Sequence, residues 1–456
     1  MHVLFLEIDT ESEWAVASLG PAAIAAHLRA QGHDASMRRI PHDMPLDAVA
    51  DTVADMLADL APVPCGAPLD TAPSAGAPVA GAAIVGLSLT ARQWPRARAV
   101  AAALHGRIAA PVVAGGLHPT FAQDEVLAAP GIHAVCVGEG ETAMAALCDA
   151  MEGRATPLAT LDWDRLPNLR RPGGPPPQLA PPLPPAQHPP LARDLLDERH
   201  GVVHMSTRRG CPFSCTYCAA RGLHRLYGRG YGGRRDVEAV MAELEAMRRA
   251  APLNYIIFVD DTFTLDPDWV AVFCHQFPRR VGVGFSIHAR ADTVTQDMLR
   301  QLARAGCRHV VFGVESGSER VRRDIMRRPM SDAQITQAFA WARDAGCVVT
   351  ANYMLGLPGE TPDEMAATLA LNERLAPDAF GWFVYQPYAG TELGERCLAD
   401  GLAGGAAKPG PDAGPPRRSI LALPDTVQDA IEQCCMRFET ARAARAATRT
   451  APTGGR

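Results

Sequence analysis

Apolar runs of strand length alternate with amphipathic helical patterns along residues 1–150. The run "HVLFLEI" predicts a strand, and "LGPAAIAAHLRAQGH" predicts a helix that begins near Pro21 and ends at Gly32. Between Pro45 and Leu60 the apolar residues recur with the spacing of one helical face. The strand-like runs "AAIVGLSL", "PVVAGG" and "HAVCVG" follow, each with a helical pattern after it. This alternation predicts a doubly wound, Rossmann-like parallel sheet that binds ligands at the carboxyl ends of its strands.

The alternation restarts near residue 200 with a second set of strand-like runs. These runs are "VVHMSTR", "YIIFVDD", "VGFSIHAR", "HVVFGVES", "VVTANYMLG" and "FGWFVYQPY", with helical patterns such as "DVEAVMAELEAMRRA" between them. Six such units predict a partial (β/α)6 barrel, in which the chemistry takes place where the strands end. The polar residues at or near those predicted ends are Asp260, Asp261, His288, Arg290, Glu315, Ser316 and Asn352.

Segments rich in proline and glycine divide the chain. The stretch that begins at Ala61 predicts a loop, and the stretch from Arg170 to Pro190 is a stronger break, because clustered prolines favour an extended chain. A third stretch begins at Gly401 and is expected to end the regular part of the chain. We therefore predict a first domain at residues 1–155, a proline-rich linker at 156–196, a second domain at 197–400, and a short C-terminal region at 401–456 with a disordered tail.

Composition and charge narrow the class of protein. Of the 456 residues, 47% are hydrophobic and 21% are charged, and the formal net charge is -6, so a globular protein is expected and nucleic acid is not an expected partner. The sequence has no apolar run long enough for a membrane span and no signal peptide pattern. We therefore expect a cytoplasmic protein whose thiols stay reduced. The end "RFETARAARAATRT" is expected to form a frayed or solvated helix in preference to a binding element.

The segment "RRGCPFSCTYCAAR" places Cys211, Cys215 and Cys218 close together. Zinc sites usually have four Cys or His ligands, and the nearest further candidate, His224, does not follow at a zinc-like interval. A disulfide is disfavoured in a reducing compartment. Three thiolates can instead bind three irons of a [4Fe-4S] cluster and leave the fourth iron open. We therefore favour a cluster whose open iron accepts a substrate or cofactor.

The CxxxCxxC spacing, with Tyr217 just before the third cysteine, resembles the radical S-adenosylmethionine (SAM) superfamily. The segments "FVDDTFT", "FSIHARAD", "VVFGVESGSERV" and "ANYMLGLPGET" are similar to successive strand-end motifs of the subgroup that carries an N-terminal cobalamin-binding domain. In the first half, "SLGPAAIAAHLRAQGHDA", "GLSLT", "VVAGGLHPTFAQDEVL" and "VCVGEGE" resemble that cobalamin-binding domain. The likeness extends over nearly all of residues 1–400.

The resemblance implies a SAM-cleaving site in the second domain. Cys211, Cys215 and Cys218 would ligate a [4Fe-4S] cluster, and SAM would chelate the open iron. One electron from a donor such as a flavodoxin or ferredoxin would then cleave SAM to methionine and a 5′-deoxyadenosyl radical. The residues that the resemblance places at SAM are Tyr217, Asp260, Asp261, Ser286, Arg290, Glu315 and Met354.

The residues themselves leave structural roles open at these positions. Asp260 and Asp261 are also suited to cap the next helix. Arg290 is also suited to pair with Asp292 or Glu315. Ser286 and His288 are also suited to a place in a packed strand.

The resemblance also implies a cobalamin site at the strand ends of the first domain. The residues placed there are Ser88, Thr90, Gly115, Gly116, Gly138, Glu139 and Gly140, whose glycines permit close backbone approach. No DxHxxG segment is present, and neither His118 nor His133 has that context. Bound cobalamin is therefore expected to lack an imidazole ligand from the protein. A domain that keeps the fold and has lost the cofactor is the alternative.

The expected activity is that of a cobalamin-dependent radical SAM enzyme acting on a small-molecule precursor. Methyl transfer to a poorly activated carbon is favoured, and radical cyclisation or oxidation without methyl transfer is the alternative. A tRNA methylthiotransferase would need a second set of cluster cysteines, and Cys65, Cys136 and Cys148 are scattered. A sensor based on cobalamin or the cluster is an alternative of another class.

Overall fold

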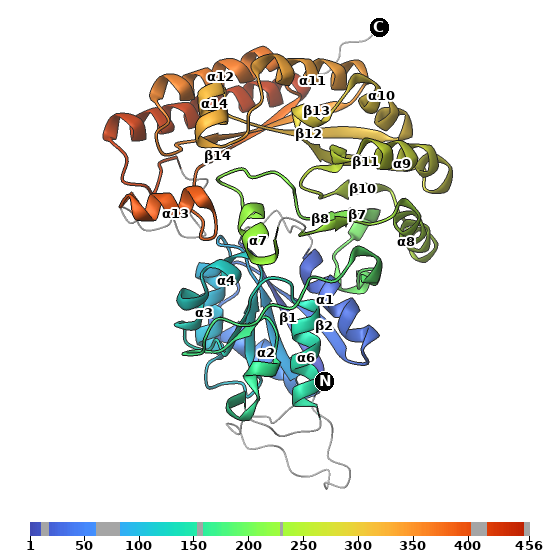
Figure 1. The fold of residues 1–456 in the computed structure, drawn as a ribbon, viewed down its shortest axis with the longest axis vertical. Helices are drawn as coiled ribbons and strands as arrows, with labels where there is room; N and C mark the ends of the chain where they lie inside the picture. The colour runs from blue at the N-terminus through green and yellow to red at the C-terminus, as the bar shows by residue number, and fades with distance from the viewer. Residues whose placement is uncertain (11–17, 61–82, 153–157, 229–230, 403–416, 451–456) are drawn as a thin grey trace. The chain divides into compact units, whose positions relative to one another are not determined.

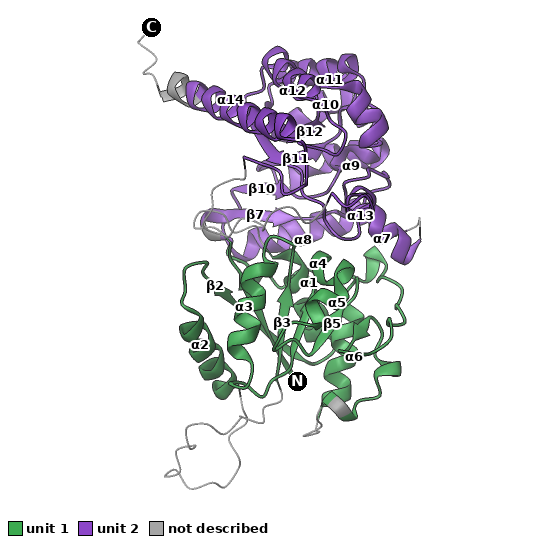
Figure 2. Cartoon of the chain, turned by 90° about the vertical axis from the view of Figure 1, so that its left-hand side faces the viewer, with its two compact units in different colours: residues 1–197, 410–412 green, residues 198–409, 413–456 purple. Residues whose placement is uncertain are grey.

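Two separate units make up the chain, and Figure 2 shows them in different colours. The computed structural model describes residues 1–10, 18–60, 83–152, 158–228, 231–402 and 417–450. Unit 1 consists of residues 1–197, and unit 2 begins at Glu198 and contains the rest of the described chain. Among the described residues, no helix combines the length and the apolar character that crossing a membrane requires. The predicted loop that begins at Ala61, and most of the stretch that begins at Gly401, lie outside the described residues.

Unit 1 is built on a six-stranded sheet with helices on both faces (Figure 1). The strand order is β2-β1-β3-β4-β5-β6, and all neighbours are parallel except β5 and β6. This arrangement confirms the predicted doubly wound sheet. The elements are β1 (His2–Ile8), α1 (Leu19–Ala30), β2 (Asp34–Ile40), α2 (Leu46–Asp59), β3 (Ala83–Ser88), α3 (Trp94–Leu104), β4 (Val112–Gly115), α4 (Leu117–Phe121), α5 (Gln123–Leu127), β5 (Ala134–Cys136), α6 (Glu141–Met151) and β6 (Leu169–Arg170).

Strand β1 shows why the first predicted strand is apolar at nearly every position. Leu4 and Leu6 belong to the core that α2 and α3 cover, whereas Val3 and Phe5 belong to the core that α1 and α6 cover. A strand that is buried on both faces has no polar face to present, so its sequence does not alternate. Gly86 on β3 leaves room for the Phe5 ring, because a Cβ at Gly86 would lie 2.7 Å from that ring.

The segment predicted as a linker at residues 156–196 belongs to unit 1. Its residues Leu169 and Arg170 form β6, which pairs with β5. Asn168, which is 2% exposed, donates from Nδ2 to the Val137 carbonyl at 2.9 Å and accepts the Ala180 amide at Oδ1 at 2.7 Å. The boundary between the units therefore follows Asp197, and the predicted linker is corrected to a segment packed along the sheet edge.

Unit 2 contains six parallel strands in the order β14-β13-β12-β11-β10-β7. The edge strands β7 and β14 do not pair with each other, so the barrel is partial, as predicted. The strands are β7 (Val202–Met205), β10 (Tyr255–Phe258), β11 (Gly284–Ala289), β12 (Cys307–Glu315), β13 (Val348–Leu355) and β14 (Ala379–Val384). The main helices are α7 (Ala220–Tyr227), α8 (Val237–Ala250), α9 (Pro267–Arg280), α10 (Gln296–Ala305), α11 (Asp332–Asp344), α12 (Pro362–Leu375) and α13 (Glu392–Ala399), and the short strands β8 (Arg208–Arg209) and β9 (Gly233–Arg234) form a separate ribbon.

The C-terminal region is more ordered than the sequence predicts. Helix α14 (Asp425–Thr450) contributes Ile431 and Phe438 to the core of unit 2, and Phe438 stacks on Trp382 with ring centroids 5.3 Å apart. The Arg442 guanidinium lies 4.7 Å from the centroid of the Trp382 ring, so the arginines of this helix do not all face solvent. The prediction that the regular part of the chain ends at Gly401 is therefore wrong. The few apolar residues of α14 hold it against β14 and α12.

Glu360, in the loop between β13 and α12, is a buried carboxyl group. It is 3% exposed, and its Oε2 accepts the amides of Gly356 at 2.8 Å and Leu357 at 3.1 Å. Burial raises its pKa from 4.5 to about 8. The folded state therefore binds a proton that the unfolded state has released, so the free energy of unfolding falls as pH rises from about 4.5 to about 8.

We predict that Glu360→Gln removes this pH dependence. A glutamine oxygen still accepts both amides and carries no charge, so the variant should be more stable than the wild type at pH 9, by a few kcal/mol, and similar at pH 5. Urea unfolding followed by circular dichroism at pH 5, 7 and 9 measures the difference. Glu373→Gln, an exposed change on α12, is the matched control. The same pH slope in the wild type and the Glu360→Gln variant would contradict the assignment.

Candidate functional site

The three predicted cysteines lie on a loop between β8 and α7. Thr216, at the centre of this loop, is 2% exposed and anchors it. The Thr216 amide donates to the Met326 carbonyl at 3.1 Å, and its Oγ1 donates to the Ile325 carbonyl at 2.6 Å. The Thr216 carbonyl accepts the Leu393 amide at 2.9 Å. The loop is therefore tied to the segment after β12 and to α13 independently of the cysteine side chains.

The spacing of the three sulfur atoms separates the two metal interpretations. A zinc ion with Zn–S bonds of about 2.3 Å would bring its thiolates within about 3.8 Å of one another. The sulfurs of Cys211, Cys215 and Cys218 do not all lie within 4.8 Å of one another. Burial raises the pKa of Cys211 and raises that of Cys218 to about 12, so thiolates here need a strong positive partner. These residues fit a polynuclear iron–sulfur cluster better than a single metal ion.

Two buried arginines approach Cys215, one at the end of β11 and one after the turn of π-helix that follows β12. Arg290, at the end of β11, lies 3.6 Å from Cys215 Sγ through Nη1, and it also binds both oxygens of Asp292 at 2.9 and 2.6 Å. Its guanidinium lies 3.6 Å from the centroid of the Phe213 ring. Arg328 places Nη1 at 4.0 Å from Cys215 Sγ and donates from Nη2 to the Gly313 carbonyl at 2.7 Å. The buried sulfur therefore has two cationic donors beside it.

Arg328 is a site residue that the sequence interpretation missed. The turn of π-helix at Val321–Ile325 precedes it, and the Arg328 amide donates to the Arg322 carbonyl at 2.7 Å. Arg322 is fully buried and donates to the carbonyls of Met330 at 2.8 Å and Ser316 at 2.6 Å. This internal bracing fixes the segment that aims Arg328 at the cysteine loop. The run "VRRDIMRRPM" contains four arginines and gives no signal for which of them is buried.

Glu315 and Tyr217 complete the group around Cys215. Glu315 ends β12 with φ of +71°, a left-handed conformation that a non-glycine residue rarely adopts. Burial raises the pKa of Glu315, whereas the nearby Arg328 and Tyr217 side chains oppose that rise. Burial also raises the pKa of Tyr217 well above its ordinary value. The structure thus brings four predicted residues, Cys215, Tyr217, Arg290 and Glu315, to one place.

The other residues predicted to contact SAM are Asp260, Asp261, Ser286 and Met354, and each has surroundings of its own. Asp260 is 1% exposed and accepts both the amide and the hydroxyl of Thr207, so it holds the chain just before the cysteine loop. Desolvation raises the pKa of Asp261, and the charge of His288 opposes that rise. Ser286 lies lower on β11, near the Tyr255 side chain. Met354 lies half-buried near the end of β13.

The residues predicted to bind cobalamin lie at the carboxyl ends of β3, β4 and β5. Gly116 has φ of +93°, and a Cβ there would lie 2.7 Å from the Leu89 amide nitrogen, so only glycine fits this close turn. The Gly138 amide donates to Thr120 Oγ1 at 2.9 Å, and the Glu139 carbonyl accepts from Asn168 at 3.2 Å. The edge therefore offers hydroxyls and tightly turned backbone, a donor set that fits a large neutral ring system. Ser88, Thr90, Gly115 and Gly140 lie at the same edge.

The two histidines of this region are engaged elsewhere. The His118 ring packs against the Trp94 ring with centroids 5.4 Å apart, and its Nε2 lies 3.8 Å from Glu125. His133 Nδ1 accepts the Val112 amide at 3.1 Å, at the amino end of β4 and thus at the opposite end of the sheet. His133 therefore lies away from the predicted cobalamin edge, and the expected absence of an imidazole ligand stays a prediction.

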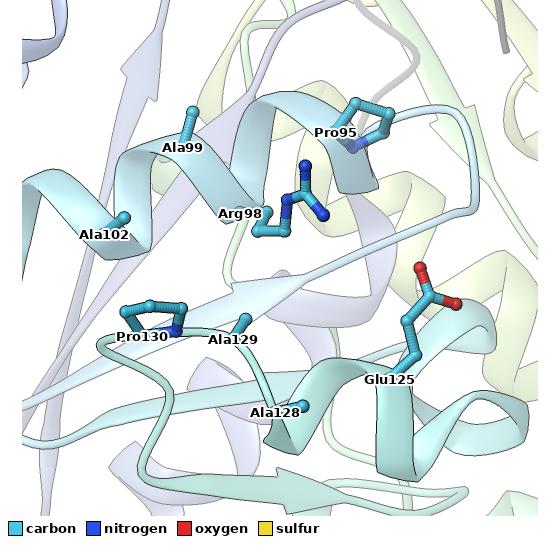
Figure 3. A pocket seen from close by; sticks show the side chains of 8 residues that line it. All are labelled: Pro95, Arg98, Ala99, Ala102, Glu125, Ala128, Ala129 and Pro130. Carbon is cyan, nitrogen blue, oxygen red and sulfur yellow. The ribbon is translucent and has the colours of Figure 1, made fainter. Parts of the chain in front are cut away.

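Unit 1 also has a hollow between α3 and the segment that follows α5 (Figure 3). Its volume is about 370 Å³, and alanines and prolines make up most of its lining. Arg98 and Glu125 are the charged lining residues. The lining includes none of the residues predicted to bind cobalamin, so this hollow is separate from the predicted site.

Comparisons with known proteins match both halves of the chain. Residues 205–371 match the model of the radical SAM superfamily, and residues 74–148 match that of the B12 binding domain. An uncharacterized methyltransferase of Pyrococcus horikoshii is 28% identical over 299 residues, which are 64% of each chain. The anaerobic magnesium-protoporphyrin IX monomethyl ester cyclase of Rubrivivax gelatinosus is also 28% identical, over 62% of this chain and 52% of that protein. The chain thus spans less than two thirds of the length of these relatives.

Two solved structures share the fold of both units. The radical SAM methyltransferase TsrM of Kitasatospora setae, with cobalamin and a [4Fe-4S] cluster bound, has a TM-score of 0.65 at 16% identity and covers 87% of this chain and 75% of its own. The cobalamin-dependent SAM radical enzyme OxsB, with aqua-cobalamin bound, has a TM-score of 0.63 at 17% identity and covers 88% of this chain and 55% of its own. The predicted fold class is confirmed.

Proposed function

We propose that this chain, which belongs to the radical SAM superfamily members that carry a B12-binding domain, catalyses methyl transfer to a poorly activated carbon of a small-molecule precursor. The observation that carries the proposal is the three-cysteine loop with two arginines beside Cys215, in a chain that also contains a B12-binding domain. When bound, the cluster would supply one electron to SAM at its open iron, and cobalamin would carry the methyl group.

The residues of unit 2 have distinct tasks in this proposal. Cys211, Cys215 and Cys218 hold the cluster, and Thr216 fixes their loop through its backbone and hydroxyl. Arg290 and Arg328 offset the negative charge of the thiolates at Cys215. A bidentate arginine is also suited to a carboxylate, although Asp292 already occupies the fork of Arg290.

Glu315 and Tyr217 are proposed to bind SAM beside the cluster. The Tyr217 side chain lies near the Glu315 carboxyl group, and the strained backbone at Glu315 holds that group at the cysteine loop. An acceptor at this position is suited to an ammonium or hydroxyl group of a cofactor. Ser286 is less suited to the same task, because it lies four residues before Arg290 along β11, roughly 13 Å at 3.3 Å per residue.

Radical cyclisation without methyl transfer is the second candidate function. The observation that favours it is the match to the Rubrivivax gelatinosus cyclase, at the same 28% identity as the match to the methyltransferase. Both functions require the same cysteine loop and an external one-electron donor, for which we propose a flavodoxin or ferredoxin. They differ in whether a methyl group leaves SAM.

Anaerobic reconstitution with iron, sulfide and hydroxocobalamin tests the proposal. With SAM and reductant, we expect one [4Fe-4S] cluster per chain, methylcobalamin, and cleavage of SAM, measured by absorbance and by chromatography of the products. Omission of the reductant is the control and should prevent cleavage. Cleavage of SAM without methylcobalamin would favour the cyclase, whereas an intact cluster that leaves SAM uncleaved would contradict both enzyme functions and favour a sensor.

A further inference from the structure

Two helix-to-strand connections of unit 2 carry the same short sequence, "AGC", at residues 305–307 and 345–347. The first connects α10 to β12 through Gly306 and Cys307. The second connects α11 to β13 through Gly346 and Cys347. Both glycines have a positive φ, of +117° and +83°, which suits glycine at a helix end. Because β12 and β13 are parallel neighbours (Figure 1), both connections lie at the amino end of the sheet.

An irregularity in β12 sets the direction of the Cys307 side chain. Phe285 on β11 pairs with Cys307, and its neighbour Ser286 pairs with His309, so Arg308 is an extra residue in β12. Register partners point to the same side of a sheet, so Cys307 points with Phe285 into the core of unit 2. Without the extra residue, Cys307 and His309 would point to the same side, because they are two positions apart.

The same irregularity brings Cys307 beside Cys347. His309 pairs with Val348 on β13, and the residues just before this pair, with Arg308 left out of the count, are Cys307 and Cys347. Neighbouring strands lie about 4.8 Å apart, which is within the span of about 4.4–6.8 Å between the Cα atoms of a disulfide. The Cys347 thiol donates to the Cys307 carbonyl, with Sγ 3.6 Å from that oxygen. Both cysteines belong to the same core and are 1% and 5% exposed.

The two thiols differ in reactivity. The neighbouring Cys307 thiol lowers the pKa of Cys347, and the Arg308 guanidinium acts in the same direction, while desolvation opposes both. Cys347 and burial raise the pKa of Cys307. The thiolate is the form that peroxides oxidise, so Cys347 is suited to react first and Cys307 second. Gly346 and Val348, on either side of Cys347, are exposed, which leaves a short path from the surface for a molecule as small as hydrogen peroxide.

We propose that Cys307 and Cys347 are a site of reversible thiol oxidation, at which a peroxide converts the pair into a disulfide. The Cys347 thiolate attacks one oxygen of hydrogen peroxide and breaks the O–O bond, which gives a sulfenic acid and a hydroxide that takes up a proton. The Cys307 sulfur then attacks the sulfenic sulfur and forms the S–S bond, and the sulfenic oxygen leaves as water with the Cys307 proton. The two sulfurs together lose two electrons, and one peroxide gains them and ends as two waters.

This site is separate from the proposed function of the cysteine loop. Cys307 and Glu315 are the first and last residues of β12, so the thiol pair and the candidate site lie at opposite ends of the same strand. Cys211, Cys215 and Cys218 take no part in the oxidation. The chain should therefore form the disulfide both before and after reconstitution of a cluster, and a failure of reconstitution would leave this test intact.

Peptide mapping by mass spectrometry tests the proposal on the reconstituted full chain. The chain is treated with hydrogen peroxide in small molar excess, its free thiols are blocked with N-ethylmaleimide in denaturant, and it is cleaved with trypsin. Trypsin leaves Cys307 in the peptide "AGCR" and Cys347 in a peptide that begins at Asp344. We expect these two peptides to be linked in most chains and two hydrogen atoms lighter than the two reduced peptides together. Dithiothreitol should return both cysteines to free thiols.

Variants test the order of the two steps. Cys347→Ser keeps a donor for the Cys307 carbonyl, should abolish the linked peptide, and should slow oxidation at Cys307 at least tenfold. Cys307→Ser should leave Cys347 as a sulfenic acid, which dimedone labels. Cys274→Ala changes a half-buried thiol on α9 and is the control, in which the linked peptide should form as in the wild type.

The peptide map of the wild type decides the proposal by itself, so the proposal stays testable if a serine variant does not fold. Free Cys307 and Cys347 after treatment that oxidises other cysteines of the chain would overturn it. It would also be overturned if Cys347 were found mainly as a sulfinic acid or linked mainly to a different cysteine. Equal dimedone labelling of Cys307 in Cys347→Ser and of Cys347 in Cys307→Ser would contradict the assignment of Cys347 as the first thiol to react.

Discussion

Replacement of Cys215 by alanine is expected to abolish the iron–sulfur cluster and all cleavage of SAM while unit 2 stays folded. Cys215 is the middle one of the three proposed cluster ligands, is 6% exposed, and is the cysteine that both arginines approach. A cluster left with two thiolates from one short loop loses a third of its protein ligands. The fold should survive, because the loop is anchored by Thr216 and because Arg290 and Arg328 keep their bonds to Asp292 and to the Gly313 carbonyl.

Iron and sulfide analysis, visible absorbance and product chromatography measure this loss, and circular dichroism checks the fold. Cys274→Ala is the matched control, because Cys274 lies on α9, outside the cysteine loop, and is half-buried like two of the three loop cysteines. The control should reconstitute to the same iron content as the wild type. Iron at wild-type stoichiometry in the Cys215→Ala variant would refute the ligand assignment.

The strands of both units are predictable from the sequence for a simple physical reason. A parallel strand that is covered on one or both faces needs apolar residues at most or alternate positions, and β1 and β12 show the two patterns. Strand β6 has only two residues, Leu169 and Arg170. Two residues are too few to show the alternation of apolar and polar positions that predicts a strand. It exists because Asn168 fixes the backbone beside β5, and that contact is not visible in the sequence.

Helix α14 shows how composition can hide a packed element. Its mean character is polar because arginine and alanine surround the few core residues, Ile431, Cys434, Cys435 and Phe438. A single aromatic side chain, Phe438, contacts Tyr353, Phe380 and Trp382. The helix is therefore held by partners far away in the sequence and not by a strong periodic pattern of its own.

Some residues of the candidate site could be predicted from the sequence, and others could not. The cysteines are predictable because their chemistry requires a fixed short spacing on one loop. The strand-end residues Arg290 and Glu315 are predictable because parallel strands end at one edge of the sheet. Asp260 is found at the expected edge, with its carboxylate bound to Thr207, and its predicted contact with SAM stays a prediction. Arg328 follows a turn of π-helix, whose irregular geometry has no sequence period.

Replacement of Arg328 by glutamine is expected to lower the reduction potential of the reconstituted cluster and to slow cleavage of SAM severely. The Arg328 guanidinium lies 4.0 Å from Cys215 Sγ and is 7% exposed. At this distance a unit charge is worth about 4 kcal/mol at an effective dielectric constant of about 20, so its loss should shift the potential by on the order of 100 mV. Glutamine keeps a donor for the Gly313 carbonyl, so iron content should stay at the wild-type level.

Potentiometric titration followed by electron paramagnetic resonance separates this effect from a structural one. If the Arg328 charge stabilises the reduced cluster, the Arg328→Gln variant should have a lower potential and a full iron content. If Arg328 is only structural, the variant should lose iron, and the clusters that remain should keep the wild-type potential. Arg328→Lys keeps the charge and should recover most of the potential. Arg323→Gln changes an exposed arginine of the π-helical turn that precedes Arg328. Arg323 binds Asp324, and its replacement should leave both the potential and the iron content unchanged. The Arg328→Lys and Arg328→Gln variants differ in charge at a buried position. If both variants had the same cluster reduction potential, Arg328 would act through packing and not through its charge.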